Sequence, residues 1–198
     1  MREYLRLLPL SFDTELAARI GEAVIKATKP VFGWYSLLKE VDISALAKPY
    51  REFGVEKEGN FLWSDEVLGF LESNYRTSMI GITILEIVRD DGQILYGHTR
   101  CTGSRQSGMA IVSASQILAE GFMDTEFVER AASQVLHEIG ESCGLQEHRE
   151  AFPELEGRLC PMASARHFIA QEGRSAQEYL QRTGIEYCPD CIERLFNS

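Results

Sequence analysis

Three cysteines and one histidine near the C-terminal end limit how this chain can fold. Cys188 and Cys191 have the C-x-x-C spacing, in which a tight turn brings two thiolates to the same side of one tetrahedral ion. Cys160 and His148 lie upstream and complete a set of four ligands. We therefore predict a zinc site without an open coordination position, which is a structural site and contributes directly to folding. Such a site would hold together residues 145–198, which show little periodicity.

Two other interpretations of the C-x-x-C pair remain open. Residues 185–195 could form a strand, the Cys-Pro-Asp-Cys turn and a helix, which is the local pattern of a thioredoxin-type redox motif. That motif normally begins its domain, whereas only seven residues follow Cys191. The two thiols could also be buried residues without a function. His167 is an alternative to His148 as the fourth ligand.

Length and composition restrict the class of protein. A chain of 198 residues with 44% hydrophobic residues can bury one good core, so we expect one domain. The formal net charge of -10 would repel phosphate backbones, which argues against nucleic acid as a partner. No segment approaches the roughly 18 apolar residues of a membrane helix, and the start lacks the pattern of a signal peptide. We therefore expect a cytoplasmic protein whose thiols stay reduced, which favours metal ligands over disulfides.

The hydrophobic pattern predicts intermingled strands and helices, as in an α/β layered domain. The run from Met79 to Val88 is nearly all apolar, which is typical of a central strand buried on both faces. Residues 39–63 are expected to be mostly irregular and residues 97–108 to form a polar loop. The other predicted strands are Tyr4–Leu10, Val31–Leu38 and Met109–Ser113, with Gln93–Tyr96 pairing back on Met79–Val88. The first predicted helix is capped at Ser11 and Asp13 and runs to about Ala27. The second covers Asp65–Ser73 and is capped at Ser64. The third covers Thr125–Cys143, and Gly144 ends it.

The last turns of the predicted long helix carry a second group of possible ligands. On a helix, His137 and Glu141 share one face, and Glu138 lies beside them. A histidine, a glutamate and a ligand-capable residue at this spacing form the frame of the H-E-x-x-H zinc hydrolases. In those enzymes the glutamate deprotonates a zinc-bound water.

From about residue 79 to the end, the sequence resembles the archaemetzincins, a branch of the metzincin zinc peptidases. Their pattern is H-E-x-x-H-x-x-G-x-x-H-C, followed by C-x-M and a distal C-x-x-C. The chain matches this pattern, in order, at His137, Glu138, Gly144, Cys160-Pro161-Met162, Cys188 and Cys191. The resemblance implies a metzincin-like fold, in which a mixed twisted sheet packs on helices and a zinc-bound C-terminal subdomain follows.

The resemblance also implies roles for single residues. Glu138 would be the general base, Gly144 the turn glycine and Met162 the methionine of the turn beneath a catalytic zinc. Residues 109–113 would be the edge strand that lines the cleft for a peptide or protein substrate. The first ligand of the family's second, structural zinc falls at His148, which would give that site a Cys₃His ligand set.

The chain departs from the family at the catalytic ligands. Glu141 and Glu147 stand where the family has its second and third histidines, and the spacers after His148 and Met162 are longer. Three interpretations stay open: no catalytic ion and no activity, an altered metal site on His137, Glu141 and Glu147 that still hydrolyses, or an ordinary polar helix face. A set with two carboxylates should bind zinc less tightly, and harder ions would compete better there.

The sequence thus predicts a zinc-binding relative of the metallopeptidases, in which one structural zinc is expected and a second, catalytic ion is doubtful. The competing hypothesis is a non-catalytic zinc-binding protein that uses the cleft to bind a peptide or a partner. We expect residues 1–198 to form one domain and the protein to be a monomer. Residues 1–144 would be the sheet-and-helix part and residues 145–198 the zinc-bound subdomain.

The remaining candidates have ordinary explanations. His98 is expected to be a solvated loop histidine, and the acidic run from Glu147 to Glu156 a solvated surface. Four residues are expected to be packing residues: Cys101, Cys143, Trp34 and Trp63.

Overall fold

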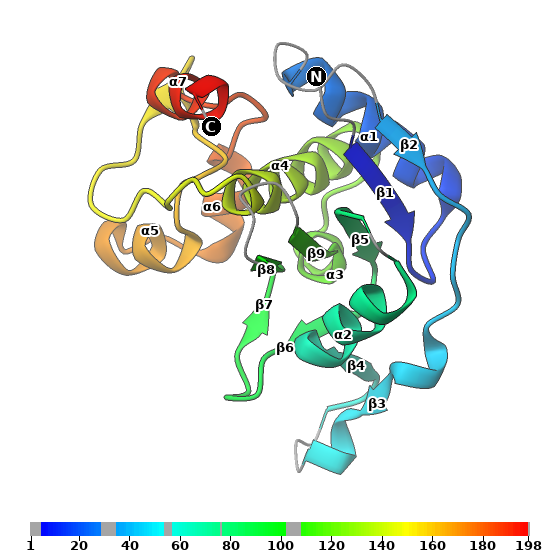
Figure 1. Ribbon diagram of the computed structural model, residues 1–198. Helices are drawn as coiled ribbons and strands as arrows, with labels where there is room; N and C mark the ends of the chain where they lie inside the picture. The colour runs from blue at the N-terminus through cyan, green and yellow to red at the C-terminus, as the bar shows by residue number, and fades with distance from the viewer. Residues whose placement is uncertain (1–4, 29–34, 54–56, 76, 102–107, 198) are drawn as a thin grey trace.

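The central element of the protein is a five-stranded sheet with helices on both faces (Figure 1). The computed structural model describes residues 5–28, 35–53, 57–75, 77–101 and 108–197. The sheet has the order β2-β1-β5-β9-β8. Its first four strands are mutually parallel, and β8 pairs antiparallel with β9 at the edge. The strands are β1 (Leu5–Pro9), β2 (Tyr35–Leu37), β5 (Met79–Thr83), β8 (Gly97–Cys101) and β9 (Gly108–Ser113).

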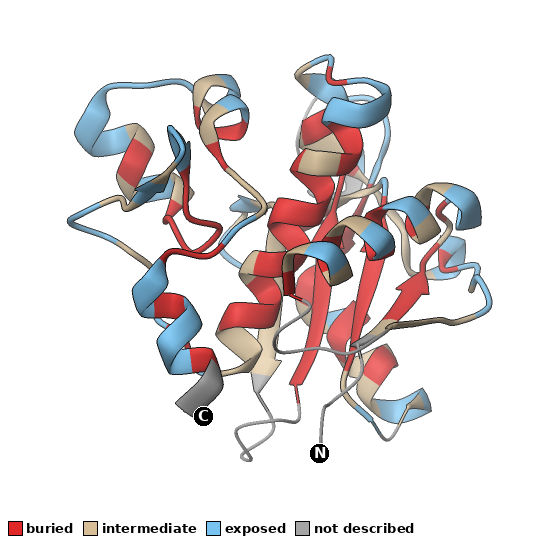
Figure 2. Ribbon diagram, turned by 90° about the horizontal axis from the view of Figure 1, so that it is seen from above, coloured by how far each residue is buried: buried red, intermediate tan, exposed pale blue. Residues whose placement is uncertain are grey.

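Two long helices pack on one face of this sheet. They are α1 (Thr14–Thr28) and α4 (Asp124–Ser142), and the short α3 (Ser115–Ala119) precedes α4. The helix α2 (Ser64–Asn74) covers the opposite face. Figure 2 shows that the central strands and most of α4 are buried, so α4 is the element around which the core is built.

A second, four-stranded sheet lies beside α2. Its order is β3-β4-β6-β7, with β4 and β6 parallel and the other two pairs antiparallel. The strands are β3 (Lys48–Pro49), β4 (Asn60–Trp63), β6 (Glu86–Val88) and β7 (Ile94–Leu95). Two short 3₁₀ helices, η1 (Ser44–Leu46) and η2 (Tyr50–Phe53), lie in the same part of the chain.

The prediction of one strand from Met79 to Val88 was wrong. The chain leaves the central sheet after Thr83 and enters the second sheet at Glu86. Ile84 in the bend is 46% exposed although it sits inside the apolar run. Both β5 and β6 are mostly buried and apolar. The composition of the run therefore does not indicate where the chain passes from one sheet to the other.

Three other local predictions were wrong. Residues 39–63 are not irregular, since they hold β3 and β4, and part of the expected polar loop, residues 97–101, is the edge strand β8. Ser64 is the first residue of α2 and makes no capping hydrogen bond. Its buried hydroxyl has no partner among the described residues. The polar side chains in β8 are explained by its position at the edge of the sheet, where a strand is partly exposed to solvent. One face of β8 packs against α4.

The other predicted elements are confirmed within a few residues. The Asp13 carboxylate accepts a hydrogen bond of 2.7 Å from the Leu16 N–H, the arrangement of a helix N-cap, whereas Ser11 bonds to Asp42 instead. The predicted long helix is α4, and Gly144 follows it with φ +82°, a conformation that favours glycine. The strand predicted over Val31–Leu38 is β2, and residues 31–34 lie outside the described part of the chain.

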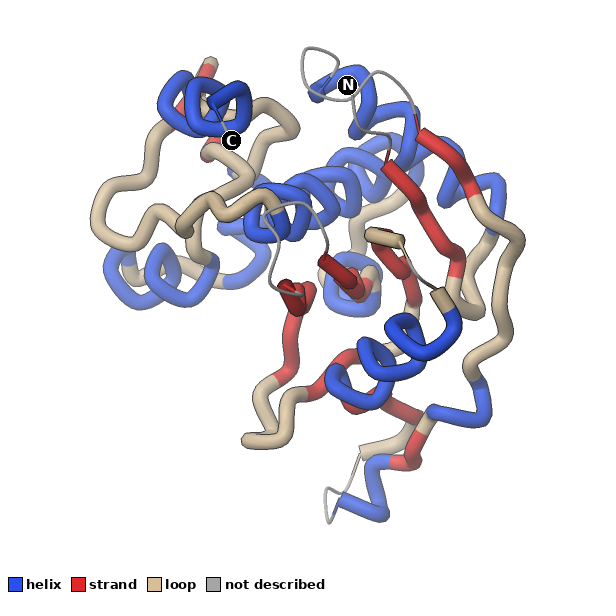
Figure 3. The backbone as a smooth tube through the Cα atoms, in the orientation of Figure 1, coloured by secondary structure: helices blue, strands red, loops and turns tan. Residues whose placement is uncertain are grey.

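The C-terminal part after Gly144 consists of loops, a short hairpin and short helices (Figure 3). A hairpin of β10 (Glu154–Leu155) and β11 (Arg158–Leu159) occupies the long spacer after His148. Three helices follow, α5 (Ala165–Glu172), α6 (Ala176–Arg182) and α7 (Pro189–Asn197). One hydrophobic cluster runs without interruption from the central sheet through α4 to Tyr179 and Leu195. The division at Gly144 into two parts of one domain stays a prediction.

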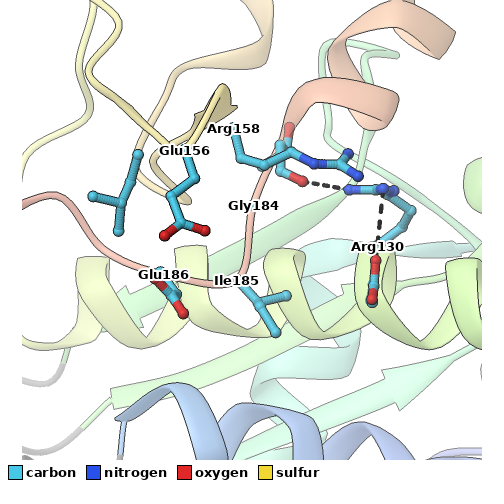
Figure 4. A pocket seen from close by; sticks show the side chains of 9 residues that line it. Arg130, Glu156, Arg158, Gly184, Ile185 and Glu186 are labelled. Atoms are coloured by element: carbon cyan, nitrogen blue, oxygen red, sulfur yellow. Dashed lines mark hydrogen bonds and ion pairs between the residues drawn. The ribbon is translucent and has the colours of Figure 1, made fainter.

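A buried arginine joins the C-terminal part to α4 (Figure 4). Arg130 is 4% exposed, donates to the Thr183 carbonyl and stacks on the Phe122 ring. Arg158 donates in the same region to the Gln181 carbonyl. The Arg130 bond ties the segment after α6 to α4, and the Arg158 bond ties β11 to the end of α6; the same segment leads on to Cys188 and α7. None of the described helices is long and apolar enough to cross a membrane.

Candidate metal centres

The four predicted structural ligands converge in space. The ligand atoms of His148, Cys160, Cys188 and Cys191 all lie within 4.8 Å of one another. Cys160 follows β11, and the C-x-x-C pair brackets the start of α7. His148 is fixed by its backbone, because its N–H donates to the Met162 carbonyl at 2.8 Å and its carbonyl accepts from Ser164 at 3.1 Å.

The spacing of these atoms fits a tetrahedral cation. The His148 Nε2 lies 3.4 Å from the Cys188 Sγ and 3.3 Å from the Cys191 Sγ, and the Cys160 and Cys191 sulfurs are 3.9 Å apart. Bonds of about 2.3 Å to sulfur and about 2.0 Å to nitrogen place tetrahedral zinc ligands roughly 3.5–3.8 Å apart. The Cys188 N–H also donates to the Cys160 Sγ at 3.4 Å, which stabilises a thiolate there. The donor set and its geometry therefore fit Zn²⁺.

The geometry argues against the rival interpretations of the C-x-x-C pair. Residues 185–187 are not a strand, so the thioredoxin-type order of strand, turn and helix is missing. Both sulfurs face a third thiol and an imidazole, which a redox pair does not need. His167 bonds to the Ser164 hydroxyl at 2.9 Å and is not a member of the cluster.

A second cluster lies at the C-terminal end of α4. Ligand atoms of His137, Glu138 and Glu141 lie within 4.8 Å of one another. The His137 Nε2 is 3.6 Å from a carboxylate oxygen of Glu141 and 3.6 Å from one of Glu147. Glu147 lies beyond the helix, and the turn at Gly144 brings it back to the same point. All three residues predicted as possible ligands of a catalytic ion therefore share one location.

The orientation of the His137 ring presents one nitrogen to these carboxylates. Its Nδ1–H donates to the Pro161 carbonyl at 2.8 Å, which leaves the Nε2 lone pair facing Glu141 and Glu147. A lone pair opposite two carboxylates is repulsive unless a cation lies between them, and a proton or a metal ion can fill that role. Burial alone lowers the pKa of His137, but the bond to Glu141 and the nearby carboxylate charges raise it to about 9.

Glu138 lies under the edge strand β8. Its side chain is 3% exposed, and one carboxylate oxygen accepts a hydrogen bond from the Thr99 hydroxyl. A side chain at Gly97 would collide with the same carboxylate, so glycine is required there for Glu138 to fit. Burial raises the pKa of Glu138, and the Thr99 bond works against that shift. Thr99 and Gly97 were not predicted from the sequence. They lie on one face of β8, and alternation along a strand is the signal that could have marked them.

Met162 packs directly beneath the second cluster. Its sulfur lies against Gly140, which is one turn of α4 from His137, and Met162 is fully buried. The backbone after Met162 holds His148, so this turn contacts both clusters. A methionine at this point shapes the floor of the site without being a ligand.

We expect Gly140→Ala to destabilise the protein, because the new methyl group would collide with the buried Met162 sulfur. Overpacking of this kind costs about 1–3 kcal/mol of the free energy of unfolding. Gly69→Ala is the matched control, since Gly69 is also helical and has no atom within 4 Å of the added methyl. It should stabilise the protein by about 0.5–1 kcal/mol. Urea denaturation of both variants measures the difference, and an equal effect of the two changes would contradict this packing.

The prediction that residues 109–113 form the edge strand of the cleft was wrong. These residues are β9, which is paired on both sides, and the edge strand is β8. His98 lies on β8 and is not a solvated loop residue, since it is half-buried on the side of α2. Burial lowers its pKa, and its Nδ1 has no partner in the described part of the chain.

The other candidates from the sequence are packing or surface residues. Cys143 is partly buried against the core, and Trp63 packs edge-on against the Phe61 ring. Glu154 pairs with Arg182, and Glu150 and Glu156 are exposed. Trp34 and the side chain of Cys101 lie outside the described residues.

A pocket of about 460 Å³ opens beside the second cluster. His137, Glu138 and Glu147 are among its lining residues, together with residues 93–97 before and at the start of β8. Residues of α5 and α6 in the C-terminal part form another wall, and α3 and α4 contribute Gln116 and Gln134. Its volume lies within the range of small-molecule and peptide side-chain pockets.

Comparison with solved structures gives three close matches in fold. The archaemetzincin of Archaeoglobus fulgidus, solved with malonate, has a TM-score of 0.67 at 16% identity and covers 97% of this chain and 99% of its own. The archaemetzincin of Methanopyrus kandleri has a TM-score of 0.64 at 19% identity, covering 98% and 94%. The chain has the archaemetzincin fold. A zinc-dependent peptidase from Methanocorpusculum labreanum matches similarly, with a TM-score of 0.66 at 14% identity, covering 98% and 100%.

The archaemetzincin fold extends over nearly the whole chain, whereas the sequence resemblance covers the part from about residue 79. No protein-family model matches the sequence, and no curated protein matches it. Identities of 14–19% show the fold alone. The chemistry of this chain therefore has to be argued from its own two clusters.

Proposed function

We propose that this protein is a metal-dependent peptide hydrolase of the archaemetzincin type with two metal centres. A structural Zn²⁺ binds to His148, Cys160, Cys188 and Cys191. A second divalent ion binds to His137 and to the carboxylates of Glu141 and Glu147, and Glu138 acts as the general base.

The observation that carries this proposal is the arrangement around the His137 Nε2. A carboxylate oxygen of Glu141 and one of Glu147 each lie 3.6 Å from it. Nitrogen and oxygen ligands of a small divalent ion lie about 2.0–2.2 Å from the metal, and hence roughly 3.3–3.6 Å apart in a tetrahedral arrangement. The hydrogen bond from His137 Nδ1 to the Pro161 carbonyl is the kind of contact that orients metal-binding histidines.

The positions of the other residues of the site support hydrolysis. A divalent ion bound there would make water a stronger acid and polarise a substrate carbonyl. Glu138 lies within 4.8 Å of the His137 and Glu141 ligand atoms, where its carboxylate can take a proton from that water. Thr99 and Gly97 hold the carboxylate in place from β8. Among the described strands β8 is the edge of the central sheet, and its Gly97 lines the pocket, so an extended peptide can add there as a further strand.

A second candidate function is binding of a peptide or partner protein without catalysis. Protonated His137 forms ion pairs with both Glu141 and Glu147, so these three side chains can be satisfied without a metal ion. In that form the cleft would persist and the structural zinc would be the one metal centre. A cytoplasmic location and a monomeric state stay predictions under both functions.

Metal content separates the two functions. We expect about two metal ions per chain in protein purified without chelators and measured by plasma mass spectrometry, one of them in the Cys₃His site. Glu147→Ala should reduce the content to about one, because it removes a ligand of the second centre. Glu150→Ala is the control, since Glu150 is exposed and outside both clusters. A content of about one in the native chain, together with no hydrolysis of a casein substrate, would favour the non-catalytic function.

A further inference from the structure

The two carboxylate oxygens of Glu147 have different partners. One oxygen faces the His137 Nε2 at 3.6 Å, and the other accepts a hydrogen bond of 3.3 Å from the Nε–H of Arg149. The backbone of Arg149 is held in place by Gln171, whose side-chain amide donates to the Arg149 carbonyl at 2.7 Å. Glu147 therefore joins the proposed second metal centre to a guanidinium group. Ligating carboxylates commonly have such a second hydrogen-bond partner.

The backbone explains why Arg149 lies on the same side of the chain as Glu147. His148 forms a parallel bridge with Ala163, so the backbone is extended at this point. Successive side chains along an extended backbone point to opposite sides. His148 points to the Cys₃His cluster, and its two neighbours therefore project to the other side, where Glu147 meets the end of α4. The residue that binds the structural zinc thus also positions the two charged residues beside it.

The charges around the second centre indicate what an arginine does there. Glu138, Glu141 and Glu147 bring three carboxylates to one place, and a divalent ion offsets two of their charges. An excess of negative charge around a metal ion makes its bound water a weaker acid. Arg149 supplies the remaining positive charge, and its influence reaches a second ligand. Burial raises the pKa of Glu141, but the bond to His137 and nearby positive charges, that of Arg149 among them, hold it below its usual value.

We propose that Arg149 compensates the extra negative charge of a ligand set with two carboxylates, and that hydrolysis at the second centre depends on this charge. The guanidinium repels the divalent ion and so weakens its binding, and the same positive charge makes the metal-bound water more acidic. Arg149 is a positioning residue, since it acts through Glu147 and is not a ligand of the ion. The inference rests on the proposed function, because it requires an ion on His137, Glu141 and Glu147.

Arg149→Gln removes the charge but keeps a side chain that can donate to Glu147. The Arg149 side chain is 65% exposed, so this change should not disturb folding. We expect the second centre to bind Zn²⁺ roughly five- to tenfold more tightly while kcat falls by a similar factor, as for the loss of one charge near a partly solvated ion. Competition with a chromophoric chelator gives the Kd in protein that keeps its structural zinc, and hydrolysis of casein at saturating Zn²⁺ gives kcat. Both differences should shrink at about 1 M salt, which screens exposed charges.

Two further variants test whether the charge itself is responsible. Arg149→Lys keeps a positive charge without the planar guanidinium, and it should return both Kd and kcat to within about twofold of the native values. Arg174→Gln is the matched control, because Arg174 is also exposed and paired with a glutamate, Glu178, which belongs to neither metal cluster. It should leave the Zn²⁺ affinity and kcat unchanged.

Several results would overturn the inference. Equal or weaker binding of the second ion by Arg149→Gln would mean that Arg149 only holds Glu147 in position or has no effect on the ion. An unchanged kcat, or a failure of Arg149→Lys to restore the native values, would also exclude charge compensation. A native chain that holds only the structural zinc and does not hydrolyse peptides would refute the proposed function and this inference with it. An active native chain with two ions, together with unchanged affinity in Arg149→Gln, would refute the inference alone.

Discussion

Replacing Cys188 with serine should remove one zinc ion per chain and unfold much of the segment after Gly144. Three thiolates and one imidazole converge from residues far apart in the sequence, so the ion links the loop after α4, the β10–β11 hairpin and α7. The apparent free energy of zinc binding in small zinc domains is roughly 10–16 kcal/mol, and such domains are unfolded without the metal. In this larger chain we expect a loss of several kcal/mol in the free energy of unfolding. Thermal melting and zinc content measure the two effects together.

Two control variants make this prediction specific. Cys143→Ser changes a cysteine that is not a member of the four-residue cluster, and it should lower stability by at most about 1 kcal/mol without loss of zinc. His148→Cys replaces the imidazole by a fourth thiolate, which zinc also accepts, so the ion should be retained. A chelator should lower the melting temperature of the native chain and of Cys143→Ser by much more than that of Cys188→Ser, which has only the ion of the second centre to lose. A Cys188→Ser protein that melts and binds zinc like its parent would rule out the Cys₃His centre.

Glu138→Gln should lower the rate of peptide hydrolysis by about 10²–10⁴-fold while both metal ions stay bound. A carboxamide has nearly the same shape as a carboxylate but cannot take a proton from water. Its oxygen can still accept the hydrogen bond from Thr99, so the local structure should be kept. Because Glu138 is not one of the proposed ligands, the loss should appear in kcat/KM and not in metal content.

The comparison with Glu147→Ala separates the base from a ligand. That variant should lose activity together with the second metal ion, whereas Glu138→Gln should lose activity alone. Glu150→Gln tests for a general effect of removing a negative charge near the site, and it should hydrolyse peptides at the native rate. Hydrolysis that survives Glu138→Gln would assign the base to another group and refute the proposed role.

The metal clusters were predictable because part of each has a local signal. Cys188 and Cys191 are close in sequence, and His137, Glu138 and Glu141 fall on one face of a helix whose apolar stripe was clear. The end of α4 at Gly144 was also evident, since glycine is favoured where the backbone takes a positive φ. The presence of His148 in the first cluster followed from counting the ligands that a closed zinc site requires.

The wrong strand predictions lie where pairing between segments distant in sequence decides whether and where a strand forms. The apolar run from Met79 to Val88 is divided between two sheets because β1 and β9 pair with its first half and β4 and β7 with its second. Residues 97–101 are a strand because β9 offers them an edge, although their composition is that of a loop. Which strands pair depends on which segments lie near each other in space, and the composition of a short stretch of sequence does not contain that information.

The sequence by itself determined the long helix, its glycine stop, and the residues that could bind metal ions. The tertiary structure alone decided that Glu147 returns to His137 and that Thr99 and Gly97 on β8 hold Glu138. The physical reason is the range of the interactions. Helix periodicity and turn preferences act over a few neighbouring residues. The contacts around the second cluster, in contrast, join segments that are distant in sequence and meet only when the core packs.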